Sequence, residues 1–225
     1  MSRYGSRRGG GISLGGISFS RREQRDLLIA WLALGVAFAL FFAGGANGAS
    51  RLLSHGGVTA VTTAFLVSLV TAGLGFLLHE LAHKVSAIHF DHVAEFRADN
   101  SMLFLAVMSA MIGFIFAAPG AVYHRGRNVT ERENGLIALA GPIVNVLLAV
   151  VFLPLLILGI LLQSDLTVLV GWRGLLINLL LAGFNMIPFG PLDGKTVIGW
   201  SPIVWAIVFL PTAGLTLVAL FGIGF

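Results

Sequence analysis

The chain has 225 residues, of which 57% are hydrophobic and only 11% are charged. Soluble domains usually carry about a quarter charged residues, so the composition excludes an ordinary soluble enzyme and indicates an integral membrane protein. The net charge is +4 and there are no cysteines, which excludes disulfides and thiolate metal sites and leaves His, Asp and Glu as possible metal ligands.

Basic residues gather near the N-terminus of the chain. They are Arg3, Arg7, Arg8, Arg21, Arg22 and Arg25. A basic arm can bind nucleic acid, but next to an apolar span it more often holds that end of the chain in the cytoplasm, so we expect no nucleic-acid partner. Residues 1–25 predict a flexible basic arm, in which residues 12–14 and 17–19 alternate as a short edge strand does. No polar linker divides residues 26–225, which predict one membrane-embedded domain.

The first two spans are separated by a glycine-rich stretch. Ser20 with Glu23 has the pattern of a capping box, which marks a helix start, and the first span is expected from about residue 27 to residue 43. Several glycines then predict an external loop over residues 44–57. A second span is expected over residues 58–88, and its length suffices to cross a bilayer.

The second span contains the pattern H-E-x-x-H at residues 79–83. Residues four apart share one face of a helix, so His79 and His83 can bind one zinc ion together. Glu80 can then take a proton from water at the metal. Two histidines could also be satisfied by hydrogen bonds and do no chemistry. Ionisable residues are costly inside a bilayer and usually functional there, so we favour the metal site.

The segments after the second span differ in polarity. Residues 89–100 are polar and predict a cytoplasmic loop. Residues 102–118 are apolar, but arginines follow them and mark the cytoplasmic side, so we expect a re-entrant element. Further spans are expected over residues 135–162 and 175–187, with an outer loop between them. Residues 197–225 predict one kinked span or two short ones, which gives an all-α polytopic transmembrane helix bundle of five or six spans.

A catalytic zinc ion needs a third protein ligand, and two residues compete for this role. His89 almost completes the longer pattern H-E-x-x-H-x-x-G-x-x-H, but Ser86 stands where a glycine would let the chain turn back. A continued helix would carry His89 about 9 Å along the axis from His83. Asp193 follows two prolines that break the fourth span, at the same end of the bundle as the histidine pair. We favour Asp193 over His89, and over a role for Asp193 as a surface helix cap.

Asn145 lies in the middle of the third span. An asparagine there commonly hydrogen-bonds a neighbouring helix. It could also contact the substrate, or donate to the oxyanion that forms when water attacks an amide. The sequence leaves both roles open.

Three motifs occur in a fixed order: H-E-L-A-H at 79–83, A-G-P-I-V-N at 140–145 and F-N-M-I-P-F-G-P-L-D-G at 184–194. Together they resemble the signatures of the site-2 protease family of intramembrane zinc metalloproteases, and the resemblance covers residues 58–195. It implies a three-span core with a re-entrant hairpin near residues 114–123. It also implies zinc ligation by His79, His83 and Asp193, with Glu80 as catalytic base.

The expected function is hydrolysis of peptide bonds within or near transmembrane segments of membrane-protein substrates. The resemblance implies regulated intramembrane proteolysis, with one catalytic Zn²⁺ ion. The expected partners are a transmembrane substrate and the lipid bilayer, and the basic arm favours a prokaryotic plasma membrane with the active site toward the cytoplasm. A zinc sensor or a transporter is the alternative. A transporter commonly carries inverted repeats, which this sequence lacks, and a pseudoprotease would be expected to have lost Glu80, which this chain keeps.

Overall fold

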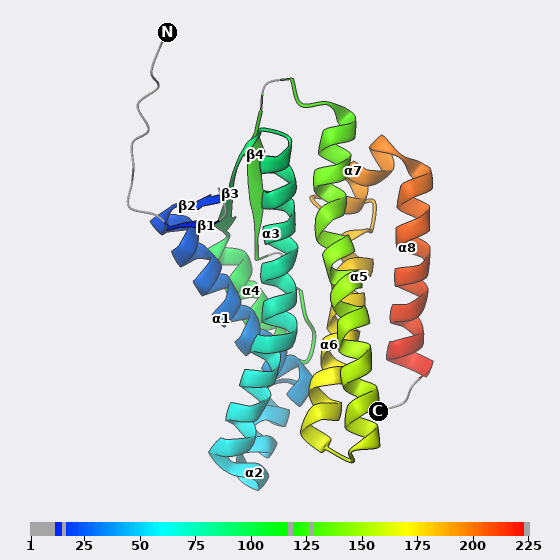
Figure 1. Ribbon diagram of the computed structural model, residues 1–225. Coiled ribbons are helices and arrows are strands. Elements are labelled where there is room, and N and C mark those ends of the chain that lie inside the picture. Colours follow the sequence, from blue (N-terminus) through cyan, green and yellow to red (C-terminus); the bar gives the residue numbers. More distant parts are fainter. Residues whose placement is uncertain (1–11, 15–16, 117–118, 127, 223–225) are drawn as a thin grey trace.

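The computed structural model describes residues 12–14, 17–116, 119–126 and 128–222 (Figure 1). Within these ranges, five helical segments are long and apolar enough to cross a bilayer, which confirms the prediction of an all-α polytopic bundle. They are α1 (Arg21–Ala43), the continuous segment Gly45–His89, α5 (Glu131–Leu161), α6 (Asp165–Asn185) and the C-terminal segment Pro202–Phe221. Residues 1–11 of the predicted arm lie outside the described residues.

The N-terminal region carries regular structure before the first span. β1 (Ile12–Leu14) pairs antiparallel with β2 (Ile17–Phe19), as the alternation predicts. α1 begins at Arg21, where the Ser20 side chain accepts a hydrogen bond from the Glu23 N–H at 3.1 Å. The helix start is therefore confirmed, but the Glu23 carboxylate does not complete a capping box.

The Glu23 carboxylate is instead buried and pairs with Lys84 of α3 (Leu74–His89). Lys84 Nζ lies 2.6 Å from both carboxylate oxygens, and it also donates to the Ser18 carbonyl at 2.8 Å. Glu23 accepts a further hydrogen bond from the Phe96 N–H at 3.0 Å. Glu23 belongs to α1 and Lys84 to α3, and their further hydrogen-bond partners belong to β2 and β3. The buried pair therefore joins α1, α3 and both small sheets.

Residues 44–57, predicted as a loop, are helical, so that prediction was wrong. Gly44 and Gly45 have φ values of 84° and 83°, and this left-handed pair reverses the chain within two residues. α2 (Gly45–Ser68) follows at once, with a kink at Gly57. The remaining glycines of the stretch were therefore mistaken for loop residues.

The second span contains a π-helical stretch, Leu69–Gly73, between α2 and α3. The Trp31 indole N–H of α1 donates to the Leu69 carbonyl at 3.1 Å. Gly73 lets the indole approach, because a Cβ there would lie 2.6 Å from Trp31 Cδ1. The widened turn is thus held by α1 about two to three helical turns before the H-E-x-x-H motif.

The re-entrant region is a strand, a helix and a strand. β3 (Val93–Ala98) pairs antiparallel with β4 (Gly120–Arg125), with Val93 opposite Arg125 and Ala98 opposite Gly120. Between them, α4 (Asn100–Met111) has 12 residues, too few to cross a bilayer. The chain therefore leaves and returns at one level, in agreement with a re-entrant element. The prediction of a plain loop over residues 89–100 was wrong, since that stretch contains β3.

The C-terminal half packs as helical hairpins. α5 starts at Glu131, behind a capping box of Thr130 and Glu133, four residues before the predicted start. α6 starts at Asp165, ten residues earlier than predicted, so the outer loop is a short turn. α7 (Asp193–Trp200) is too short to span, and α8 (Pro202–Leu217) supplies the single C-terminal span. Among the alternatives for residues 197–225, the part that the structure describes, up to residue 222, has one span.

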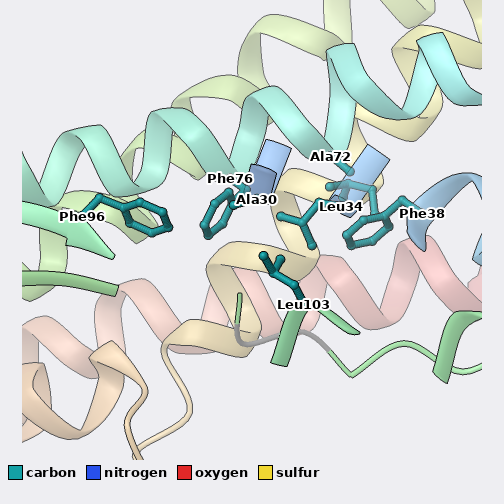
Figure 2. Packing of buried hydrophobic residues seen from close by; sticks show 8 residues of the cluster. Ala30, Leu34, Phe38, Ala72, Phe76, Phe96 and Leu103 are labelled. Carbon is teal, nitrogen blue, oxygen red and sulfur yellow. The ribbon is translucent and has the colours of Figure 1, made fainter. Parts of the chain in front are cut away.

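The main core cluster lies between α1 and α3 and extends to β3 and α4 (Figure 2). Leu34 and Phe38 of α1 pack against Phe76 of α3. Phe76 meets Phe96 of β3 edge-on, with ring centroids 5.8 Å apart. Burying these aromatic and aliphatic side chains fixes the start of α3 and holds the β3–β4 hairpin beside the H-E-x-x-H motif.

Candidate metal centre

His79 and His83 lie one turn apart on α3, and both side chains are buried. Their Nε2 atoms are 3.0 Å apart, and their rings meet edge-on. Helical periodicity places both imidazoles on the same face, toward α5 and α7. Gly141 of α5 leaves room for them, since a Cβ there would lie 2.5 Å from His83 Nε2 and 2.6 Å from His79 Nε2.

Asp193 reaches this pair from the first residue of α7. Its Oδ2 atom lies 3.2 Å from His79 Nε2 and 3.4 Å from His83 Nε2. After α6 ends, the chain turns through Pro188 and Pro191 and packs tightly on itself. A Cβ at Gly194 would lie 2.1 Å from the Met186 carbonyl oxygen, so only glycine fits this close approach. The end of the helix that the two prolines predicted therefore directs the Asp193 carboxylate toward the histidine pair.

The far nitrogen of each imidazole has its own acceptor. His79 Nδ1 lies 2.6 Å from Asn145 Oδ1, and His83 Nδ1 lies 2.7 Å from the Ile137 carbonyl oxygen. Both acceptors lack a proton to give, so each Nδ1 carries the hydrogen and each Nε2 has a free lone pair. This is the arrangement found where histidines bind metals.

The three inward atoms fit a metal ion. Tetrahedral zinc with bonds of about 2.0–2.1 Å separates its ligand atoms by roughly 3.3 Å, close to the separations of His79, His83 and Asp193 given above. Two lone pairs and a carboxylate that face one another without a proton repel, and a cation between them removes that repulsion. Asp193 Oδ2 also has no hydrogen-bond partner. Within the described residues, these three side chains form the group of His and acidic residues able to hold a metal ion.

Glu80 is buried beside the histidines, and its Oε2 atom has no hydrogen-bond partner. The Val122 backbone of β4 contacts its carboxylate. Glu80 and the three candidate ligands line a cavity of about 190 Å³, which also touches Gly120 and Ala121 of β4. A free carboxylate oxygen in such a cavity can accept a proton from water at the metal position.

The other predicted residues lie outside this cavity wall. His89, at the end of α3, stacks edge-on with Phe90 and is not part of the metal-binding group. Asn145 stands behind His79, and its amide N–H groups point to the Gly75 carbonyl at 3.2 Å and to Asn178 Oδ1 at 2.9 Å. In this geometry both N–H donors are engaged and Oδ1 contacts His79 Nδ1. The oxyanion or substrate contact expected of Asn145 stays a prediction.

Sequence reasoning missed two polar residues near the site. Asn178 of α6 is fully buried, and its amide donates to the Gly174 carbonyl at 2.8 Å, which completes a chain from His79 through Asn145. His124 of β4 lines the polar cavity and stacks on His92 with ring centroids 5.6 Å apart. Partial burial lowers the pKa of His124, and neighbouring His92 lowers this pKa further. The signal that singled out Asn145 is an asparagine within an apolar span, and the same signal would have pointed to Asn178.

A buried His–His–Asp group with an adjacent glutamate, inside a multi-pass helical bundle, is typical of a membrane-embedded metallohydrolase. The chain is 40% identical, over 204 residues, to a protein of Methanocaldococcus jannaschii named "Putative zinc metalloprotease". The match covers 90% of this chain and 97% of that protein. The chain therefore belongs to the same zinc metalloprotease family. No family model matches the chain, and no solved structure matches it.

Proposed function

We propose that this protein is an intramembrane zinc metalloprotease of the site-2 type, which cuts peptide bonds within or near transmembrane segments of membrane-protein substrates. One observation carries the proposal: His79, His83 and Asp193 converge beside Glu80 within a bundle of apolar helices. The name of the M. jannaschii relative supports zinc as the metal. Its role in the cell would be regulated intramembrane proteolysis.

The residues present fit a single Zn²⁺ ion held by His79, His83 and Asp193. When bound there, zinc would supply Lewis acidity that makes water nucleophilic near neutral pH. Glu80 takes the proton from the attacking water and then delivers it to the amine that leaves. Asn145 and the Ile137 carbonyl keep both imidazoles turned toward the metal throughout.

The substrate must expose an amide that its own helix hides, so it must unwind locally. β4 can hold the unwound segment. Phe96 of β3 lies opposite Val122 of β4, but the Phe96 N–H donates to Glu23 and not to β4. The two residues are therefore a non-hydrogen-bonded pair, and the backbone N–H and C=O of Val122 point away from β3. Among the described residues this sheet has two strands. Apart from the contact of the Val122 backbone with Glu80, the outer edge of β4 is therefore left for strand addition next to that carboxylate.

The location that fits this function is a prokaryotic plasma membrane, with the N-terminus and the active site toward the cytoplasm. The support is the run of arginines at the start of α1. This start lies at the same end of the bundle as α7, which begins at Asp193 (Figure 1). The polar cavity, whose wall includes His124, Asn134 and Thr196, gives water a way to the site from that side.

The deciding experiment compares the purified parent with Glu80→Gln at equal zinc content, using a model single-span substrate in detergent. We expect Glu80→Gln to keep zinc and to lose cleavage by about a hundredfold or more, because it removes the general base. Cleavage that survives the substitution would show that Glu80 is not the base, or that another protease is present.

A further inference from the structure

Two cavities meet at Glu80 and His79. The polar one contains the candidate metal ligands, and the second is apolar, with a volume of about 120 Å³. Glu80, His79, Gly120 and Ala121 line both. A peptide laid along β4 would therefore pass both cavities.

Core residues form the floor of the apolar cavity. Leu34 and Phe38 of α1 and Phe76 of α3 line it, and these three side chains are at most 5% exposed (Figure 2). Leu181 and Phe184 of α6 also line the cavity, and Phe184 is 39% exposed. The floor is thus fixed by packing, while the α6 side reaches the surface.

We infer that this cavity is the subsite that receives one aliphatic side chain of the substrate, next to the bond that is cut. The inference rests on the proposed protease function and adds a substrate preference to it. An apolar side chain placed here gains by leaving water, whereas an acidic one would lie against Glu80 with no Lys or Arg in the cavity lining.

The volume sets an upper limit on the accepted side chain. Apolar cavities of roughly 150 Å³ hold a benzene ring, and the cavity here is smaller. We therefore expect valine, leucine and methionine side chains to be accepted better than phenylalanine and tryptophan. Leu181 is the half-buried lining residue whose truncation would make the most room without touching the metal centre.

The test uses a set of single-span substrates that differ only at the residues on either side of the cleaved bond, which mass spectrometry locates. Alanine, leucine, phenylalanine and aspartate are compared at each position. At one of the two positions, the parent should cut the leucine substrate roughly tenfold faster than the phenylalanine or aspartate substrate.

Leu181→Ala should shift the leucine-to-phenylalanine ratio toward phenylalanine by about tenfold. Leu180→Ala is the matched control, because Leu180 packs against the same core cluster but does not line the cavity. Retained zinc content shows that each variant is folded. Phe184→Ala is a second cavity variant that costs little stability, because its side chain is partly exposed.

An unchanged ratio in both folded cavity variants would overturn the subsite while leaving the protease proposal intact. Equal rates for all flanking residues in the parent would do the same. If the zinc-loaded parent cut none of the substrates, the proposed function itself would fall, and the subsite with it.

Discussion

At the scale of single residues, the candidate metal centre depends on side chains that do not touch the metal position. His79 is held by Asn145, and Asn145 is held by Asn178, all within the buried part of the bundle. Hydrogen-bond partners of this kind fix the tautomer and the orientation of a metal-binding histidine. The affinity for zinc should therefore depend on residues two steps away from it.

Asn178→Leu should weaken zinc binding by about tenfold, because Asn145 loses its partner and becomes free to turn away from His79. Competition with a chelator measures the affinity, and the spectrum of the cobalt-substituted protein reports the ligand geometry. Thr216→Val in α8 is the control, since it also removes a buried hydrogen bond, from the Thr216 hydroxyl to the Thr212 carbonyl, but one with no link to His79. Equal zinc affinity in the two variants would contradict the positioning role of Asn178.

Because the Lys84–Glu23 pair is buried, we expect that removing one charge will destabilise the protein more than removing both. Lys84→Met leaves the Glu23 carboxylate buried without its cation and should destabilise the protein by about 3–5 kcal/mol. Adding Glu23→Gln to Lys84→Met removes the orphan charge and should recover part of that loss. Denaturation in detergent, compared at equal zinc content, gives the order of stability. A double variant less stable than Lys84→Met would mean that the pair acts through its hydrogen bonds to Ser18 and Phe96 rather than through charge.

At the scale of elements, β4 is the strand that joins the core to the site. One side of it is paired with β3, and its Gly120–Ala121 end lines both cavities. If substrates add to its outer edge, only alternate substrate residues turn their backbone groups toward β4.

N-methylation of single amides in a peptide substrate should therefore show a period of two. Methylation of an amide that faces β4 should slow cleavage by roughly tenfold, by loss of one hydrogen bond and a steric clash. The amide of the next residue should tolerate methylation. Mass-spectrometric rates for a methyl scan across the cut site give the pattern, and a scan without alternation would argue against strand addition.

The limits of sequence reasoning can be seen in particular elements. The start of α1 and the five spans follow from apolar length and from the Ser20 cap, because these signals are local. β3 was missed because its alternation, with Ala94 and Phe96 buried, is hidden in a short polar stretch. The convergence of Asp193 with the histidines was expected from motif order. The partners of Glu23 and Asn178 could not be foreseen, since each partner lies on a distant helix.

At the scale of the whole molecule, the candidate ligands tie α3 to α7, two elements on opposite sides of the α5–α6 hairpin in the sequence. A metal that binds only the folded arrangement stabilises it by mass action. Zinc should thus act as a tertiary link in addition to its chemical role.

Removing zinc with a chelator should lower the thermal stability of the parent in detergent. With zinc at a hundred times its Kd, the expected stabilisation is about 2.7 kcal/mol. Asp193→Ala should lose most of this zinc-dependent shift while keeping the stability of the metal-free parent. A full zinc-dependent shift in Asp193→Ala would show that zinc binds elsewhere.

The π-helical stretch at Leu69–Gly73 sets the rotational phase of everything that follows it in the second span. An α-helix advances by 100° per residue, so the extra residue that a widened turn absorbs decides the direction in which His79 and His83 point. Trp31 holds that turn from α1. The metal-binding face of α3 is therefore aimed at Asp193 by a feature two to three turns upstream. The gain or loss of one residue there would re-aim the face without any change to the motif itself.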